Sequence, residues 1–66
     1  MERGDWVQLQ AYGGEIIRRR VVEVARDTVY VCRDEEYEKA ERERREPVAI
    51  GFRLGDVVND RAETSV

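Results

Sequence analysis

The sequence predicts a small α+β domain that is mainly β: a curled antiparallel sheet or small barrel of four to five strands, with one charged helix between strands three and four. Three observations support this fold class. Valine occurs ten times in the 66 residues, and β-branched side chains favour strands. Apolar and polar residues alternate over several short segments, which is typical of half-buried strands. A single stretch after Arg33 instead has acidic residues first and basic residues last, the charge order that suits a helix.

Length and composition exclude several classes of protein. Sixty-six residues make one domain, which we place at residues 1–58, followed by a flexible tail at 59–66. The chain has no histidine and one cysteine, which excludes a zinc finger, a histidine-based catalytic triad and a disulfide within the chain. The longest apolar run is far too short to cross a membrane, and the N-terminus lacks the apolar segment of a signal peptide. We therefore expect a cytoplasmic protein that makes no membrane contact.

The first strand is predicted at residues 5–11, where the alternation is clean. Val7 and Leu9 share one face, and Trp6 lies on the other. A Gly-Gly pair then ends the strand, because glycine adopts a positive φ without steric cost.

The second strand, residues 16–25, breaks the alternation. Ile17 falls on the odd face, whereas Val22 and Val24 fall on the even face. One extra residue in a strand reverses its face register, so we expect a bulge or bend near Arg20. A hairpin turn at Arg26 and Asp27 then leads to a return strand at 28–33.

The helix is predicted to span Asp34–Arg45 and to stop before Pro47. Asp34 is available as the N-cap, and its only apolar residues are Tyr37 and Ala40, so most of its surface should be solvated. Three acid-first pairs at i,i+4 are expected to support it: Glu35–Lys39, Glu38–Arg42 and Glu41–Arg45.

Residues 47–54 restore a clear alternation and predict the fourth strand. The face that we assign to the core comprises Val48, Ile50, Phe52 and Leu54. A turn follows at Gly55 and Asp56, and Val57 and Val58 add a possible short fifth strand.

In outline, the chain resembles the SH3-like small β-barrel superfold. The resemblance covers about residues 4–58 and rests on the segment Gly4–Val7 entering the first strand, on the Gly-Gly loop and on the bent second strand. It implies a closed or nearly closed barrel. The helix lies where such barrels usually have a short loop, so the sequence departs from the pattern there and leaves closure open.

The sequence gives little support to catalysis. Cys32 has no histidine partner and lies in a strand, where a lone cysteine is usually a small buried hydrophobic residue. The many glutamates belong to a solvated helix face, and no spaced carboxylate loop predicts a metal site. The Gly-Gly pair lacks the residues that complete a phosphate loop. We therefore expect a protein that is not an enzyme and needs no cofactor or metal.

The run Arg18, Arg19 and Arg20 is the one unusual local feature. Strand geometry sends Arg18 and Arg20 to one face and Arg19 to the other. Together with Tyr30, these arginines could hold single-stranded RNA or DNA by pairing phosphates and stacking bases. A net charge of −3 opposes that interpretation. The alternative is that they pair with acids on neighbouring strands or on the helix.

Trp6 is either covered by the helix or exposed. If it is exposed, Trp6, Tyr12 and Tyr30 form an aromatic patch that would bind a protein partner. If it is covered, Tyr37 and Ala40 are the residues expected to cover it. The favoured function is a non-catalytic interaction module that binds a protein partner or a second copy of itself, and the alternative is binding of single-stranded nucleic acid.

Overall fold

A computed structural model describes residues 1–59 of the chain. Its elements follow the predicted order, with two short 3₁₀ turns added. They are β1 (Trp6–Gln10), η1 (Tyr12–Gly14), β2 (Ile16–Ala25), β3 (Thr28–Cys32), α1 (Asp34–Glu43), β4 (Ile50–Arg53), η2 (Leu54–Asp56) and β5 (Val57–Asn59).

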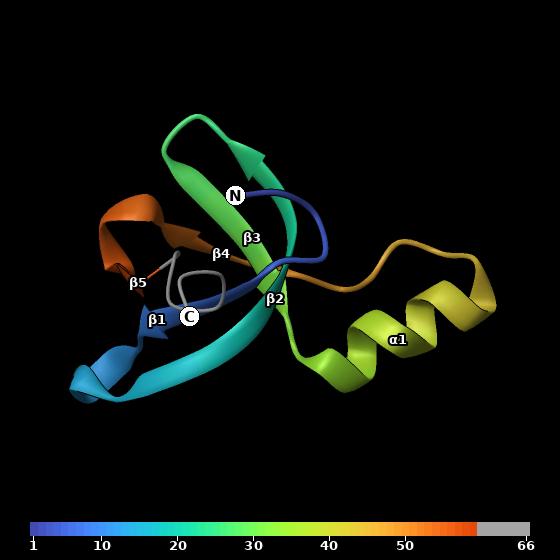
Figure 1. The fold of residues 1–66 in the computed structure, drawn as a ribbon, viewed down its shortest axis with the longest axis horizontal. Helices are drawn as coiled ribbons and strands as arrows, with labels where there is room; N and C mark the ends of the chain where they lie inside the picture. The colour runs from blue at the N-terminus through green and yellow to red at the C-terminus, as the bar shows by residue number, and fades with distance from the viewer. Residues whose placement is uncertain (60–66) are drawn as a thin grey trace.

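The five strands form one antiparallel sheet in the order β4-β3-β2-β1-β5. Consecutive strands pair with each other from β1 to β4, and β5 returns to the free side of β1. Figure 1 shows that the sheet curls strongly and that α1 projects from one end of it instead of lying flat across it. The predicted fold class, a curled and mainly β sheet with one helix between the third and fourth strands, is confirmed.

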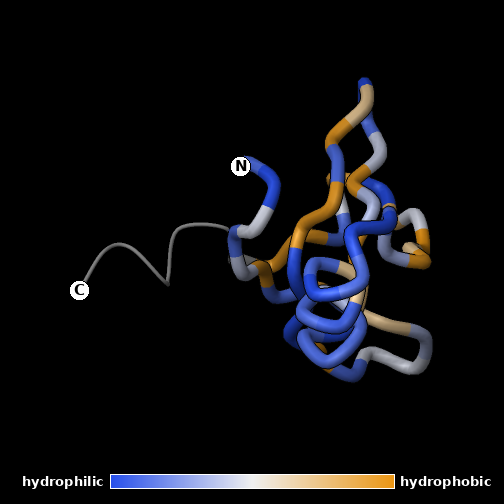
Figure 2. The backbone as a smooth tube through the Cα atoms, turned by 90° about the vertical axis from the view of Figure 1, so that its right-hand side faces the viewer, coloured by the Kyte–Doolittle hydropathy of each residue, from blue (hydrophilic) through white to orange (hydrophobic). Residues whose placement is uncertain are grey.

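The main core lies on the inner side of the curl, which we call the concave face. Its buried residues come from the three central strands, and partly buried residues from β2, β4, η2 and β5 pack against them. The buried members are Val7, Leu9, Val21, Val29 and Val31. Figure 2 shows this distribution, since hydrophobic segments follow the strands while most of the helix is hydrophilic.

The predicted bulge lies in β2, one to two residues beyond Arg20. The pairing of β2 with β3 shifts register between Val21 and Glu23, so Val22 is the extra residue. Val21 belongs to the concave core, whereas Val22 packs with Cys32 and Tyr37 on the opposite side of the sheet, which we call the helix face. The bulge therefore lets one strand contribute to two apolar clusters.

The helix is shorter than predicted and is capped differently. Arg33 occupies the N-cap position without a side-chain cap, and Asp34 is the first helical residue. The helix ends at Glu43 because Arg44 adopts a left-handed conformation, with φ of 56°, and its N–H donates to the carbonyls of Ala40 and Glu41. The stop is thus made by backbone geometry three residues before Pro47.

The reversal at Arg44 also changes the expected pairing of Arg45. Its guanidinium lies 2.6 Å from Glu43 and 2.7 Å from Glu36, in place of the predicted partner Glu41. Because the chain turns back at Arg44, the side chain of Arg45 no longer continues the i,i+4 row of the helix.

The prediction for the fourth strand is wrong in part. The strand is Ile50–Arg53, and only Phe52 and Leu54 of its predicted inward face pack against the core. Val48 is 75% exposed and Ile50 is 67% exposed. The physical reason is that β4 lies at the edge of the sheet, where no further strand or helix of residues 1–59 closes over its end.

The last strand, β5, includes Asn59, which pairs with Gln8. The remainder of the predicted tail, residues 60–66, lies outside the described residues. Within residues 1–59, no helix is long and apolar enough to span a membrane.

Candidate functional site

The three consecutive arginines of β2 are divided between the two faces of the sheet. Arg20 pairs with Trp6 of β1, and Arg18 lies opposite Gln8, so both are on the helix face. Arg19 lies opposite the core residue Val7 and therefore belongs to the concave face. This division follows the alternation predicted from the sequence, because the bulge comes after the arginines.

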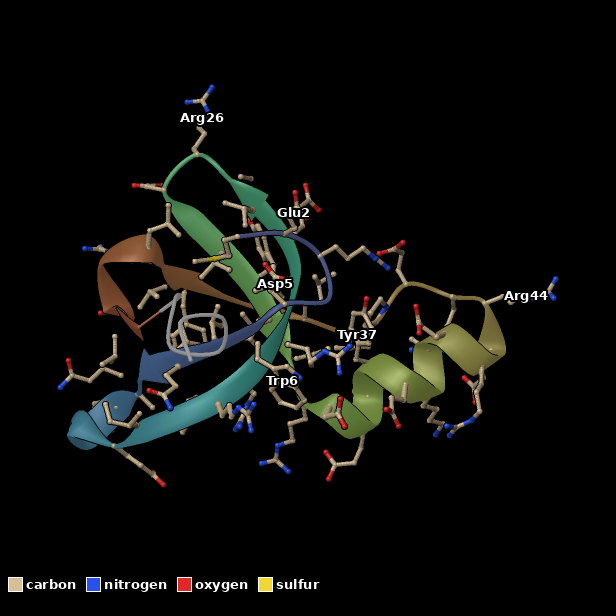
Figure 3. All side chains as sticks on the ribbon, in the orientation of Figure 1. Glu2, Asp5, Trp6, Arg26, Tyr37 and Arg44 are labelled. Atoms are coloured by element: carbon tan, nitrogen blue, oxygen red, sulfur yellow. The ribbon has the colours of Figure 1, made fainter. Side chains whose placement is uncertain are left out.

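Trp6 lies between two guanidinium groups. The Cζ atom of Arg18 is 4.3 Å from the centroid of the Trp6 ring, and that of Arg20 is 4.9 Å from it. Arg20 also stacks on Tyr37 at 4.5 Å, and Figure 3 shows Trp6 and Tyr37 converging where the sheet meets α1. Trp6 is therefore half-buried, and the guanidinium of Arg20 lies between it and the helix residue expected to cover it.

Arg20 is held in this position by an ion pair. Its Nη1 donates to Oδ1 of Asp34 at 2.7 Å, and the Arg20 side chain is only 19% exposed. Its Nε is buried without a hydrogen-bond partner in the described part of the chain. Arg20 thus connects the sheet to the first turn of α1, which leaves it poorly placed to bind a phosphate.

Tyr12 and Tyr30 do not join Trp6 in one patch. Tyr12 is fully exposed in the η1 turn, and the length of β1, about 20 Å of extended chain, separates it from Trp6. Tyr30 lies on β3 opposite Glu23 and Gly51, and its ring covers the space beside the glycine. The three aromatic residues proposed from the sequence as one binding surface are therefore found at separate places.

A groove of about 380 Å³ lies on the concave face and is open to solvent beside β4. Apolar side chains from β2, β3, β4 and the segment before β4 form most of its surface, and three charged residues complete it. The lining consists of Ile17, Arg19, Val31, Cys32, Arg33, Glu36, Val48, Ile50 and Phe52.

The charges of the groove are unequally compensated. Glu36 accepts two hydrogen bonds from Arg45 and one from the Val48 N–H. The hydrogen bond from Arg45, followed by that from Val48, lowers the pKa of Glu36 to about 2. Arg19 donates to the carbonyl of Arg18, and within residues 1–59 neither Arg19 nor Arg33 has a carboxylate partner. The groove is therefore apolar with a positive rim, on a protein of net charge −3.

Cys32 borders the groove at the end of β3, and its buried thiol packs with Val22 and Tyr37 on the helix face. Desolvation by burial, followed by the nearby charge of Glu36, raises the pKa of this thiol above its usual value. The thiol is therefore protonated at neutral pH, and Cys32 contributes as a small apolar side chain, as the sequence predicts. Within residues 1–59, no three histidine, cysteine or acidic side chains gather in a group that could hold a metal ion.

Sequence reasoning missed the groove although it identified most of its residues. The alternation over 47–54 correctly places Val48, Ile50 and Phe52 on one side, but that side was assigned to a closed core. Arg33 was noted only as a neighbour of Cys32. The signal that could have found the site is the apolar face of the fourth predicted strand, read together with its position at an edge of the sheet.

Comparison of the chain with protein-family models, curated proteins and solved structures found no match. The class of protein is therefore described from its fold and its candidate site alone. It is a small, mainly β domain with a curled five-stranded antiparallel sheet, one projecting helix and an open apolar groove beside an edge strand.

Proposed function

We propose that this protein is a non-catalytic interaction module that binds a protein partner through the groove on its concave face. The observation that carries the proposal is the exposure of Val48 and Ile50, at 75% and 67%, beside a strand edge that no other described strand pairs with. Two β-branched side chains left in water on a domain with so small a core are best explained by a partner that covers them.

We also propose that the sheet is an SH3-like barrel left open on one side. The pairing of β1 with both β2 and β5 brings the first and last strands together, which is how small barrels reduce their exposed edges. The helix between β3 and β4 takes the place of the short loop expected in that superfold, and the sheet remains open beside it.

Binding of single-stranded nucleic acid has less support as a function. One of the arginines proposed for it is occupied within the fold, because Arg20 is paired with Asp34 and stacked on two rings. Arg19 lies on the other face of the sheet. Phosphate pairing and base stacking on one surface would require these contacts to be broken.

The proposal is tested by photo-crosslinking in the cells that produce the protein. A photoreactive amino acid replaces Ile50 in one sample and, as a control, replaces Arg42 on the exposed surface of α1. We expect a defined adduct from position 50 that is absent from position 42 and is reduced by Val48→Glu. An adduct of twice the chain mass identifies a second copy as the partner. Equal or absent adducts at the two positions, with a monomer in sedimentation, would overturn the proposed function.

A further inference from the structure

We infer that the groove binds an extended peptide segment that carries aliphatic and acidic side chains and adds to the sheet as a sixth strand beside β4. This inference rests on the proposed function and names the chemistry of the partner. It draws on three properties of the same region: an unpaired strand edge, an apolar floor and two uncompensated arginines.

The first property is the backbone edge of β4. Within residues 1–59 this strand pairs only with β3, through Ile50, Gly51, Phe52 and Arg53, and it ends the sheet. Alternate residues of an antiparallel edge strand direct their N–H and C=O groups away from the sheet, where another strand can pair with them. The Val48 N–H is already bonded to Glu36, so the free edge begins at Ile50. An added segment would thus pair with about four residues, the length of β4.

The second property is the floor of the groove. Ile17, Val31 and Phe52 come from three adjacent strands and form an apolar surface beside the edge. A strand added at that edge would direct every second side chain toward the concave face. Aliphatic side chains at those positions would cover Ile50 and Val48, which water now surrounds.

The third property is the charge. Arg19 projects from the concave face of β2, and Arg33 lies at the start of α1, so both border the apolar floor. Neither has a carboxylate partner within residues 1–59, whereas Glu36 is fully paired. A guanidinium binds carboxylates through two parallel hydrogen bonds. The complementary segment therefore carries at least one aspartate or glutamate beside its aliphatic residues.

The charge pattern favours this peptide over a phosphate-bearing strand. Binding of single-stranded nucleic acid uses several aromatic rings on which bases stack, whereas the floor of this groove is aliphatic apart from one phenylalanine. A nucleic acid would also meet a chain of net charge −3. A short acidic segment needs only the two local arginines.

The experiment measures binding of defined peptides to the full chain by fluorescence anisotropy. The probe is a fluorescein-labelled seven-residue peptide, Asp-Thr-Val-Thr-Ile-Thr-Asp, with blocked ends, in which the aspartates share one face of an extended strand with the aliphatic residues. Three controls change one property each: lysines replace the aspartates, serines replace the aliphatic residues, or N-methyl groups block alternate backbone N–H groups. We expect saturable binding of the probe and a loss of about tenfold or more with each control peptide.

Variants of the protein then locate the site. Arg19→Gln and Arg33→Gln should each weaken binding of the probe by about tenfold. Arg42→Gln removes the same charge from the exposed surface of α1 and should leave binding unchanged. Ile50→Ser, at a position already 67% exposed, should weaken binding without loss of the folded circular-dichroism spectrum.

Two results would overturn the inference. The first is no binding of the probe by folded protein, and the second is binding that is equal for the lysine peptide or unaffected by Arg19→Gln and Arg33→Gln. Either result together with a position-specific adduct at residue 50 would leave the proposed function standing and assign the groove a partner of different chemistry. Absence of that adduct would instead remove the proposed function itself.

Discussion

Arg20 and Asp34 provide the sharpest test of how the helix is held to the sheet. Their side chains meet at 2.7 Å with exposures of 19% and 37%, so solvent screens this pair less than a surface pair. Asp34→Ala would leave the Arg20 guanidinium between two rings with its Nε already unpartnered. We expect this variant to lose stability and α1 to lose its attachment.

The expected magnitude follows from the geometry. A hydrogen bond to a charged partner contributes about 1.5–3 kcal/mol when both groups are withdrawn from water. The partial exposure of Asp34 places the coupling near the lower end, at about 1.5–2 kcal/mol. A domain of this size has only about 3–10 kcal/mol of total stability. The loss should therefore lower the melting temperature by roughly 6–16 °C.

The assay is a double-mutant cycle of Asp34→Ala with Arg20→Met, measured by urea unfolding. The cycle is needed because Asp34 also interacts with the positive end of the helix dipole, a contribution that the single variant would include. Arg3 and Glu46 provide a matched control pair at 3.3 Å, with side chains 47% and 79% exposed. A coupling energy for Arg20 and Asp34 no larger than that of the control pair would refute the reasoning.

Three further predictions follow from the described contacts. Hydrogen bonds from Arg45 and Val48 lower the pKa of Glu36 from 4.5 to about 2, so the stability that they provide should be present above pH 4.5 and be lost as the pH falls toward 2. Glu36→Gln should reduce this loss of unfolding free energy at low pH, measured by urea unfolding at a series of pH values. An unchanged pH dependence would contradict the pairing. Gly4→Ala should lower the free energy of unfolding by about 1–2 kcal/mol, because Gly4 has a φ of +93° and the Tyr37 hydroxyl lies 3.2 Å from the position of the added carbon. Gly55→Ala, with open space around it, is the near-neutral control in thermal melts. Cys32 should react slowly with iodoacetamide at neutral pH and rapidly in urea, because burial raises its pKa and blocks access; rapid labelling of the native protein would show that the thiol is accessible.

Local pattern was sufficient to predict the elements of this fold. The alternation in β1 and β3, the broken phase of β2 and the charge order of α1 each depend on neighbours in the sequence. The phase break predicted the bulge because Ile17 and Val24 cannot both face the core in a straight strand. These elements were predicted correctly because each pattern involves only residues that are close together in the sequence.

The candidate site depended on long-range geometry that the pattern does not contain. Whether Val48 and Ile50 are buried is decided by what closes over the end of β4, and nothing within the described residues does so. The left-handed turn at Arg44 was equally invisible, because arginine has no strong preference for that conformation. This turn redirects Arg45 to Glu36 and so fixes one wall of the groove.

The stack around Trp6 has a practical consequence for studying the protein. Trp6 is the only tryptophan in the chain, and it lies at the junction of sheet and helix between two guanidinium groups. Its fluorescence therefore reports on that junction, while far-ultraviolet circular dichroism reports on the whole backbone. If the helix detaches before the sheet unfolds, the two signals will change at different urea concentrations, so the native chain already carries the reporter needed to separate the two events.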